Sequence, residues 1–283
     1  MSDLSNLSWP APAKINLFLR ITGRREDGYH NIQTLFQLLD WGDQIRIRPT
    51  SSPHIIRLPA PYDVPAAEDL AVRAAQLLQK NTGCRRGAEI GVDKKVPLGS
   101  GMGGGSSDAA TVLLVLNRLW DCGLGVDDLA HLGRGLGADV PVFVRGHSAM
   151  AEGVGERLEP VSLGERYYVV LFPGFSISTA EIFSDPDLPR DSKPVSLAEA
   201  ISGQGGNDCE TVVRKRFPAL AGIMDSLQDW GRPMMTGTGS AIFMAMSDKK
   251  SAMSTANALK TLYNVRAVRG VDRSALLERL DSY

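Results

Sequence analysis

Cysteine and histidine are scarce in this chain, which holds three cysteines and four histidines among 283 residues. Cys84, Cys122 and Cys209 are odd in number, lie far apart and form no C-x-x-C pair. This pattern argues against a disulfide framework, which needs paired cysteines, and against a zinc site built on closely spaced cysteines. The histidines form no group with the spacing of metal ligands. We therefore expect reduced thiols and no structural metal.

Excess charge and long apolar runs are also missing. The 31 basic residues nearly balance the 32 acidic residues, which gives a formal net charge of -1. Proteins that bind nucleic acid usually carry a basic excess, so we expect no nucleic-acid partner. No apolar run reaches the roughly 18 residues of a membrane helix, and the first residues lack the basic and then apolar pattern of a signal peptide. We expect a cytoplasmic protein without a membrane partner, and the oligomeric state is left open.

Glycine, in contrast, is concentrated in one place, because five glycines lie within segment 96–107, VPLGSGMGGGSS. An apolar run at 108–120 follows directly and predicts a buried helix. Glycines let a ligand approach the backbone closely, and the N-terminus of a helix presents unpaired N–H groups to an anion. An ordinary turn needs only one or two glycines. The segment therefore predicts a phosphate-binding loop rather than a tight turn before a helix.

Two common phosphate-binding loops do not fit this segment. Its glycines satisfy G-x-G-x-x-G, but Pro97 interrupts the strand that the dinucleotide motif needs, and no apolar strand leads to Asp121. A P-loop requires a lysine where Gly105 stands. A dinucleotide-dependent oxidoreductase and a P-loop enzyme are therefore both disfavoured.

Three segments together resemble the motifs of the GHMP kinases, the family of galactokinase and of homoserine, mevalonate and phosphomevalonate kinases. They are 12–19 (PAKINLFL), 97–107 and 235–241 (MTGTGSA), in the order and spacing of the family. Further segments are similar to one branch of the family, whose substrate carries a cytidine diphosphate group. They are 23–30 (GRREDGYH), 34–36 (TLF), 137–143 (GADVPVF) and 151–156 (AEGVGE).

The resemblance implies an α+β fold of two domains with the active site in the cleft between them. The N-terminal domain, 1–160, would be similar to the second domain of ribosomal protein S5 and would bind ATP, and the C-terminal domain, 161–283, would be ferredoxin-like. Residue patterns agree with an α+β fold without selecting this one. They predict strands at 15–21, 43–48, 89–94, 167–172 and 242–246, and helices at 66–80, 108–120 and 127–136. They also predict a surface insertion at 184–206 and a domain boundary within 153–165.

The resemblance implies catalytic roles for Asp139 and Lys14. Asp139 would orient the acceptor hydroxyl and receive its proton while the phosphoryl group of ATP is transferred. Lys14 would keep Asp139 ionised and offset negative charge on the developing alkoxide. From local sequence alone, Asp139 is also a suitable N-cap before Pro141, and a lone lysine at the start of a strand is usually a solvated charge. The motif context favours catalysis, and Asp139 can fill both roles.

The resemblance also implies two ligand sites, one for ATP and one for a small substrate with a cytidine diphosphate group. A pyrimidine needs a flat aromatic surface and hydrogen bonds at its edge, which Tyr29, Phe183 and His30 would supply, although core packing is the alternative for each aromatic residue. The expected substrate-binding residues are Asn16, Tyr29, His30, Phe36, Thr179 and Phe183. The expected ATP-binding residues are Pro97, Leu98, Gly99, Ser100, Gly101, Met102, Gly103, Gly104, Gly105, Ser106 and Ser107.

Magnesium is expected with ATP, because the β- and γ-phosphate oxygens need charge neutralisation. The resemblance implies a loop serine and a separate glutamate as ligands, as in other branches of the family; Ser107 would fill the first place, but the sequence identifies no glutamate. Lys94 and Lys95 fit contact with the nucleotide and capping of a strand end equally well. The third motif, 235–241, either brings glycine backbone near the phosphates or supports the second motif, and a plain β-turn is the alternative.

Two other functions within the same family are open at this point. One is a sensor of GHMP fold that binds ligands without turnover, and the presence of both Lys14 and Asp139 argues against it. The other is a kinase for a different small alcohol, of homoserine or phosphomevalonate type. Segment 28–30 (GYH) argues against that kinase, because those substrates carry no base to stack.

Overall fold

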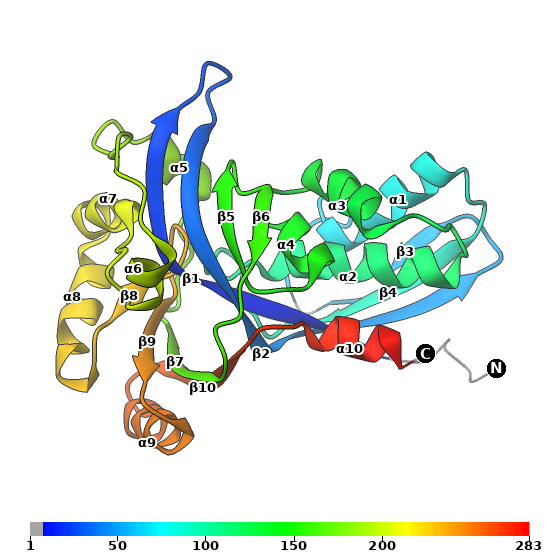
Figure 1. Ribbon diagram of the computed structural model, residues 1–283. Helices are drawn as coiled ribbons and strands as arrows, with labels where there is room; N and C mark the ends of the chain where they lie inside the picture. Colours follow the sequence, from blue (N-terminus) through cyan, green and yellow to red (C-terminus); the bar gives the residue numbers. More distant parts are fainter. Residues whose placement is uncertain (1–7, 61, 283) are drawn as a thin grey trace.

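The computed structural model describes residues 8–60 and 62–282. Ten strands form one sheet, and helices pack against it (Figure 1). The strands are β1 (Ser8–Arg24), β2 (His30–Thr50), β3 (Ile55–Arg57), β4 (Gly87–Asp93), β5 (Ala149–Gly153), β6 (Arg157–Pro160), β7 (Arg166–Phe172), β8 (Met234–Met235), β9 (Ile242–Met246) and β10 (Asn264–Val271). The helices are α1 (Leu70–Thr82), α2 (Gly104–Leu119), α3 (Val126–Arg134), α4 (Val140–Arg145), α5 (Thr179–Ser184), α6 (Leu197–Ile201), α7 (Asp208–Arg216), α8 (Pro218–Ser226), the 3-10 turn η2 (Gln228–Trp230), α9 (Lys249–Leu259) and α10 (Ala275–Asp281).

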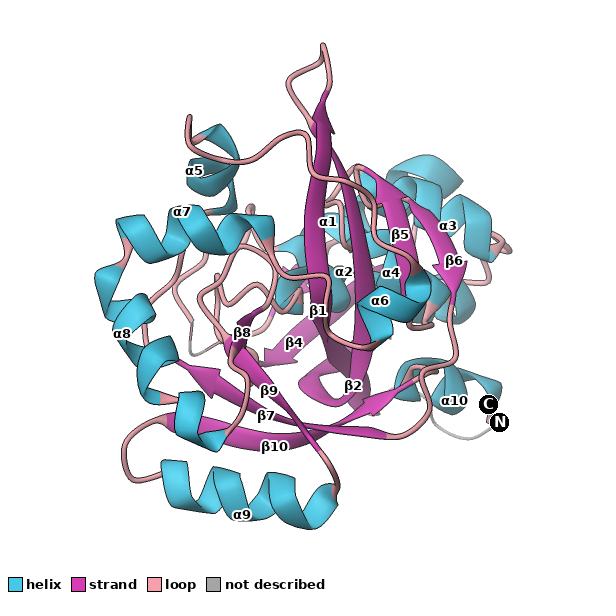
Figure 2. Ribbon diagram, turned by 60° about the vertical axis from the view of Figure 1, so that its left-hand side comes forward, coloured by secondary structure: helices cyan, strands magenta, loops and turns pink. Residues whose placement is uncertain are grey.

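Two long antiparallel strands, β1 and β2, run through both halves of the molecule (Figures 1 and 2). Their pairing extends from Ser8 opposite Arg46 to Arg24 opposite His30, and it contains three register shifts that bend the ribbon. In the described sheet β1 is an edge strand, because β2 is the one strand that pairs with it. Pro10 and Pro12, which lack a backbone N–H, are tolerated in such a strand. The outer edge of β1 is therefore open to other parts of the chain.

The other edge of β2 meets three strands in succession. It pairs with β5 over residues 32–36, with β10 at residues 38–39, and with β4 over residues 44–50. The strands β7, β9 and β8 continue the sheet from β10, and β3 lies beyond β4. One strand thus joins the N-terminal and C-terminal parts of the sheet and fixes their relative position.

The apolar side chains form three clusters along this ribbon. The largest lies under α1, α2, α3 and α4, and Leu276 and Leu280 of α10 join it from the other end of the chain. A second cluster lies between the C-terminal strands and helices α7, α8 and α9. The third contains Ile15 and Leu35 of the long strands together with Phe243 of β9. The long strands contribute to all three clusters, so they hold the two halves together through side chains as well as through backbone.

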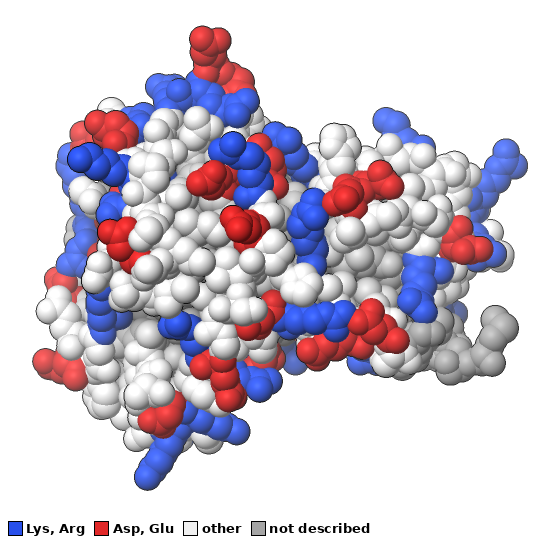
Figure 3. Space-filling model, viewed as in Figure 1, with Lys and Arg blue, Asp and Glu red and all other residues white. Residues whose placement is uncertain are grey.

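The surface carries charges of both signs. On the face shown in Figure 3, basic and acidic side chains are interspersed, and no broad area of one sign covers it. Among the described helices, none is long and apolar enough to cross a membrane. The hairpin between β1 and β2 projects from the body of the molecule, at the top of Figure 1.

Several expected elements are confirmed, including the strand at Ile242–Met246. Helix α2 begins at residue 104, inside the glycine segment, and not at 108 as expected, because tertiary packing overrides the low helix propensity of glycine. Among the elements that were not predicted are β6 within 153–165 and α6 within 184–206. The first is mostly exposed and is stabilised by backbone pairing with β5, so it has no apolar pattern for sequence inspection to detect.

A substitution at Gly42 tests the close contact of β1 with β2. A Cβ atom there would lie 2.1 Å from Ala11 O and 2.7 Å from Pro12 Cα, and both atoms are backbone that cannot move aside. We expect Gly42→Ala to lower the free energy of unfolding by about 2–3 kcal/mol, measured by urea denaturation. Gly222→Ala in α8 is the matched control, because nothing lies within 4 Å of its added Cβ. If the free energy of unfolding falls no more for Gly42→Ala than for the control, the close contact between β1 and β2 at this position is contradicted.

Candidate active site

The outer edge of β1 is where the candidate site is assembled. Four of its N–H groups donate to acceptors that come from loops, turns and a helix start far away in the sequence. The bonds run from Lys14 N to Met102 O (3.1 Å), from Asn16 N to Thr236 Oγ1 (2.9 Å), from Leu19 N to Gly206 O (2.9 Å) and from Ile21 N to Asp208 Oδ2 (2.7 Å). Each bond satisfies a buried donor. Together they dock the glycine segment, the third motif and the start of α7 along one strand.

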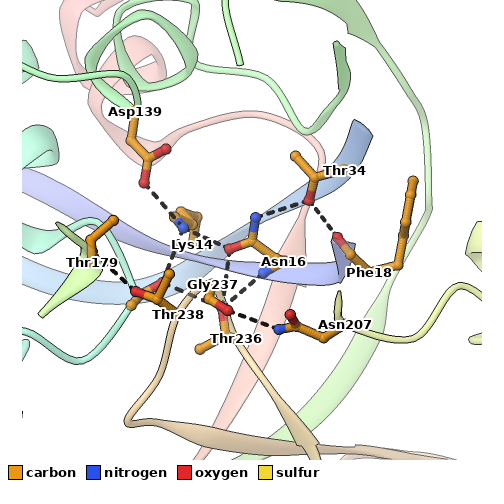
Figure 4. A network of polar contacts seen from close by, with 11 residues as sticks. Lys14, Asn16, Phe18, Thr34, Asp139, Thr179, Asn207, Thr236, Gly237 and Thr238 are labelled. Carbon is orange, nitrogen blue, oxygen red and sulfur yellow. Dashed lines mark hydrogen bonds and ion pairs between the residues drawn. The ribbon is translucent and has the colours of Figure 1, made fainter. Parts of the chain in front are cut away.

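Lys14 lies at the centre of the site and is almost fully buried. Its ammonium donates to Asn16 Oδ1 at 2.7 Å and to Gly101 O at 3.0 Å, and it lies 3.1 Å from Asp139 Oδ2 (Figure 4). The ring of Phe36 lies beneath it, with the ring centroid 5.2 Å from Nζ. A buried ammonium needs such partners, because an isolated charge is costly away from water. Lys14 therefore connects a carboxylate to the backbone of the glycine segment.

Asp139 stands directly before α4, at the N-cap position considered from the sequence. Its side chain makes no capping hydrogen bond. The carboxylate turns instead toward Lys14, and 31% of its side-chain surface is exposed. The N-cap role is therefore wrong for the side chain. The carboxylate is held from one side and is open to a ligand from the other.

The third motif is more than a β-turn, because its side chains are tied into the site. Thr236 is fully buried, and its hydroxyl lies 3.3 Å from Asn16 Oδ1 and 3.4 Å from Gly101 O. Asn207, the N-cap of α7, donates its side-chain amide to Gly237 O at 2.8 Å. Figure 4 shows these residues converging around Asn16. The motif braces the first and second motifs against each other.

The glycine segment approaches its neighbours more closely than other residues would allow. Gly101 and Gly103 have φ angles of 75° and 71°, which side chains rarely adopt. A Cβ at Gly101 would lie 2.4 Å from Thr236 O, and one at Gly103 would lie 2.8 Å from the Phe143 ring and 3.2 Å from Lys14 Cε. These two glycines therefore bring the loop into contact with the third motif and with Lys14.

Helix α2 begins immediately after the loop, with Gly103 as its N-cap. No side chain caps it, and the first backbone hydrogen bond runs from Ser107 N to Gly103 O at 2.8 Å. The N–H groups of residues 104–106 have no acceptor among the residues that the structure describes. The Ser107 hydroxyl is buried and has no hydrogen-bond partner in the same part of the chain. Unpaired donors at a helix start are suited to binding an anion.

Lys94 and Lys95, which the sequence does not distinguish, have different environments. Lys95 is exposed, whereas the ammonium of Lys94 is buried between Asp43 Oδ2 at 2.6 Å and Asp108 Oδ2 at 2.7 Å. The other oxygen of Asp43 accepts the backbone N–H groups of Lys95 at 2.5 Å and Val96 at 2.8 Å. The cluster of Asp43, Lys94 and Asp108 thus clamps the beginning of the glycine segment to the first turns of α2.

This buried cluster contains two carboxyl groups and one ammonium. Burial raises the pKa of Asp108 well above the ordinary carboxyl value, and the neighbouring Asp43 adds to this effect. Oδ1 of Asp108 is buried without a hydrogen-bond partner among the described residues, whereas both oxygens of Asp43 have donors. A proton on Asp108 leaves the cluster neutral, which is the cheaper state in a low-dielectric interior.

The expected substrate residues lie in two different places. His30 and Phe183 are in contact, with ring centroids 5.3 Å apart, and Tyr29 is 66% exposed on the β1–β2 hairpin. Thr179 is exposed at the start of α5, where its hydroxyl lies 3.0 Å from that of Thr238. Phe36, in contrast, is 1% exposed and lies beneath Lys14. The aromatic rings at the hairpin are accessible to a ligand, and Phe36 is a floor of the lysine site.

Comparisons with known proteins agree with this geometry. The family model described as the GHMP kinases N terminal domain matches residues 69–147. A 4-diphosphocytidyl-2-C-methyl-D-erythritol kinase of Nitrosococcus oceani is 46% identical over 275 residues, which cover 97% of this chain and 98% of the relative. The chain belongs to the GHMP kinase family. A relative of the same name from Halorhodospira halophila is 49% identical, with 95% of this chain and 94% of the relative covered.

A solved structure shows the same architecture as this GHMP kinase. The crystal structure of 4-(cytidine 5'-diphospho)-2C-methyl-D-erythritol kinase superposes with a TM-score of 0.81 at 36% identity, over 94% of this chain and all of the other. The α+β GHMP kinase fold expected from the sequence is confirmed. The structure brings Lys14, Asp139 and the glycine segment together as that resemblance requires.

Some residues of this GHMP kinase escaped the sequence interpretation. Asp43 and Asp108 stand at the start of an expected strand and an expected helix, and no motif spacing links them. Each is an acidic residue that proves to be buried, which the sequence alone does not indicate. Arg190, which contacts His30, lies in segment 184–206, where composition predicts only a surface insertion. Such partners are found through tertiary contacts, because no periodic pattern links residues so far apart.

The protonation of Asp108 has a measurable consequence for stability. The pKa of Asp108 is higher in the folded chain than in the unfolded chain, so between these two pKa values the folded chain holds an extra proton. The free energy of unfolding therefore falls as the pH rises from the unfolded-chain pKa to the folded-chain pKa. Asp108→Asn replaces the protonated acid by a neutral amide and removes this fall. We expect the variant to exceed the parent by about 1–3 kcal/mol in free energy of unfolding at pH 9, with little difference at pH 5.

The measurement is urea denaturation across this pH range, with Asp93→Asn as control. Asp93 is exposed and directly precedes Lys94, so its replacement should leave the pH dependence unchanged. A parent stability that does not fall toward high pH contradicts the assignment of the proton to Asp108.

Proposed function

We propose that this GHMP kinase transfers the γ-phosphoryl group of ATP to the 2-hydroxyl of 4-diphosphocytidyl-2-C-methyl-D-erythritol, a step of non-mevalonate isoprenoid precursor synthesis. The observation that carries the proposal is the position of Lys14, whose ammonium lies 3.1 Å from the Asp139 carboxylate and 3.0 Å from the carbonyl of Gly101 in the glycine segment. An acceptor beside Asp139 would thereby lie next to the glycine segment proposed to bind the phosphates of ATP. The names of the relatives supply the substrate.

ATP would bind with its phosphates against the glycine segment and the start of α2. The uncapped N–H groups of residues 104–106 and the helix dipole favour negative charge there. Gly103 leaves the space beside Lys14 free of a side chain. The buried cluster of Asp43, Lys94 and Asp108 would act indirectly, by holding both ends of the loop in place.

Asp139 and Lys14 would divide the chemistry of transfer between them. As the acceptor oxygen forms its bond to the γ-phosphorus, the bond from that phosphorus to the bridging oxygen of ADP breaks, and the acceptor proton passes to the Asp139 carboxylate. Lys14 would stabilise negative charge on the acceptor oxygen and on the transferred group. Asn16 and the Phe36 ring would keep the ammonium in this position.

Mg²⁺ is proposed to accompany ATP, and the residues present offer it one protein oxygen. No group of three or more histidine, cysteine, aspartate or glutamate side chains in the described ranges is arranged to hold a metal. Mg²⁺ in kinases is bound largely by phosphate oxygens and water, so a full protein cage is not needed. The unpartnered hydroxyl of Ser107, in the first turn of α2, is the protein oxygen that would join it. The ion would supply neutralisation of phosphate charge.

The cytidine diphosphate end of the substrate would lie along the β1–β2 hairpin. Tyr29 offers an exposed ring on the hairpin for stacking, and the rings of Phe183 and His30 are in contact with each other. Thr179 and Asn16 would contact the part of the substrate between the base and the reacting hydroxyl. Phe36 would act through Lys14 rather than through the base, since its ring is buried.

The remaining expectations are kept as proposals. We infer a division into an ATP-binding domain at 1–160 and a ferredoxin-like domain at 161–283, with α10 returning to the first core. A cytoplasmic location and the absence of nucleic-acid and membrane partners fit a small-molecule kinase with this balanced charge.

The test of the proposed function is a coupled assay of the purified chain with ATP and Mg²⁺. The acceptors are 4-diphosphocytidyl-2-C-methyl-D-erythritol, homoserine, mevalonate and phosphomevalonate. Turnover of the first acceptor alone supports the proposal. Turnover of another acceptor identifies a different kinase of the family, and binding without any turnover identifies a sensor.

Removing the charge of Asp139 tests its catalytic role. We expect Asp139→Asn to lower kcat by about 10²- to 10⁴-fold, the usual range for a positioned acid or base. Affinity for a non-hydrolysable ATP analogue should be retained, because Asp139 is directed at Lys14 and the acceptor. Asp127→Asn, an 81% exposed side chain on neighbouring α3, is the control for general effects. Near-normal turnover of Asp139→Asn would remove this residue from the mechanism.

The exposed ring of Tyr29 tests the position of the base. Loss of one stacking partner costs about 1–3 kcal/mol, so Tyr29→Ala should weaken CDP by roughly 5- to 150-fold. Tyr29→Phe should have little effect, because the flat surface is kept. Both variants should bind a non-hydrolysable ATP analogue as the parent does, measured by calorimetry. Intact CDP binding in Tyr29→Ala is the result that speaks for a kinase of a smaller alcohol.

A further inference from the structure

We propose that Thr34 is a positioning residue for Lys14, because its hydroxyl group fixes which end of the Asn16 amide faces the lysine ammonium. The inference rests on the proposed function, in which Lys14 stabilises charge on the acceptor oxygen. Thr34 is the first residue of segment 34–36 (TLF), and its side chain is fully buried on β2. We assign it no contact with ATP or with the acceptor, since it acts through Asn16.

Thr34 reaches the site at a bulge in the ribbon of long strands. Asn16 pairs with Phe36. Three residues further along β1, but only two residues away on β2, Leu19 pairs with Thr34. At this bulge the Thr34 hydroxyl donates to Phe18 O at 2.5 Å. A carbonyl oxygen can only accept, so this bond uses the one hydrogen of the hydroxyl and leaves Thr34 Oγ1 as an acceptor.

The hydroxyl thereby decides the orientation of the Asn16 amide. Asn16 Nδ2 donates to Thr34 Oγ1 at 2.9 Å, and Asn16 Oδ1 accepts from Lys14 Nζ at 2.7 Å (Figure 4). In the reversed orientation the amide oxygen would face a hydroxyl oxygen that has no hydrogen to give, and the amide nitrogen would face another donor. Donation therefore runs in one direction, from the ammonium through the amide and the hydroxyl to the backbone carbonyl.

The amide oxygen is one of three acceptors around the Lys14 ammonium, which has three hydrogens to donate. The other two are Gly101 O at 3.0 Å and Asp139 Oδ2 at 3.1 Å. Gly101 belongs to the glycine segment, and Asp139 would lie beside the acceptor. Asn16 is therefore the partner that holds the ammonium between the two reacting groups. An amide that turns away removes this partner and lets the ammonium move.

Burial makes the arrangement depend on Thr34. The exposed fractions are 3% for Lys14, 4% for Asn16 and 0% for Thr34, so water does not readily replace a lost partner. The Thr236 hydroxyl lies 3.3 Å from Asn16 Oδ1 and 3.4 Å from Gly101 O. A hydroxyl with more than one possible acceptor can face either end of an amide, so Thr236 does not select the orientation.

The experiment measures steady-state turnover of 4-diphosphocytidyl-2-C-methyl-D-erythritol by the full chain. Thr34→Val keeps the shape of the side chain but leaves Asn16 Nδ2 without its acceptor. An unpaired buried donor is costly, and we expect kcat to fall by about 5- to 150-fold. Affinity for a non-hydrolysable ATP analogue should stay that of the parent. Thr34→Ala should lose kcat in the same range, whereas Thr34→Ser keeps the hydroxyl and should recover most of it.

Thr111→Val is the matched control. Thr111 is also fully buried, and its hydroxyl also donates to a carbonyl of β1, that of Pro10, at 3.4 Å. The control variant removes a buried hydroxyl without touching the amide, so it should keep the kcat of the parent. A double variant separates positioning from general damage. Since Asn16→Ala has no amide to orient, adding Thr34→Val to it should lower kcat no further.

The side-chain amide of Asn16 gives a readout that does not need turnover. In ¹H–¹⁵N spectra of asparagine-labelled protein, assigned with Asn16→Ala, its hydrogens should exchange slowly with water in the parent, in Thr34→Ser and in Thr111→Val. Exchange should be faster in Thr34→Val, because the hydrogen bond to Thr34 is lost.

Several results would overturn the inference. They are a parent-like kcat in Thr34→Val, no recovery in Thr34→Ser, an equal loss in Thr111→Val, or a further loss when Thr34→Val is added to Asn16→Ala. A parent that does not phosphorylate the acceptor points instead to failure of the proposed function. The exchange comparison then decides whether Thr34 holds the amide, and equal exchange in the parent and in Thr34→Val contradicts it.

Discussion

The structure depends most on the outer edge of β1, where four backbone N–H groups have no strand to pair with. A buried donor must find an acceptor, and these four find theirs in the glycine segment, the third motif and the region around the start of α7. Three segments far apart in the sequence are thereby brought to one line. The site is the consequence, because Lys14 and Asn16 belong to the same stretch of strand as the donors and meet whatever docks there.

Two buried lysines extend this arrangement in different ways. Lys14 joins the loop carbonyl of Gly101 to Asp139, which remains partly open to a ligand. Lys94 joins the beginning of the loop to α2 and is closed in by Asp43 and Asp108. A buried ion pair contributes less to stability than its Coulomb energy indicates, because both charges lose their hydration. The main effect of these two lysines is positional, since each one holds together chain segments that meet at the site.

The two proposed ligand sites, one for ATP and one for the base of the substrate, are built by different means. At the proposed ATP site the phosphates would meet backbone N–H groups at the start of α2, which the glycines leave uncovered by side chains. At the proposed base site the recognition groups would be side chains on a projecting hairpin and on α5. Arg190 ties the loop after α5 to His30. Backbone recognition suits a phosphate, which is the same in every nucleotide, and side-chain recognition suits a base, which is not.

The sequence by itself determined the family, the types of the main elements and the glycine segment that leads into a helix, because these follow from local composition, periodic patterns and motifs of contiguous residues. It gave too short a range for β2 and no sign of β6, since the pairing of long bent strands depends on partners elsewhere in the chain. Only the tertiary structure decided that Asp139 faces Lys14 instead of capping α4, that Lys94 rather than Lys95 is buried, and that Arg190 meets His30. Each of these is a contact between side chains that the sheet and its loops bring together, and the geometry of such a contact is absent from any single stretch of sequence.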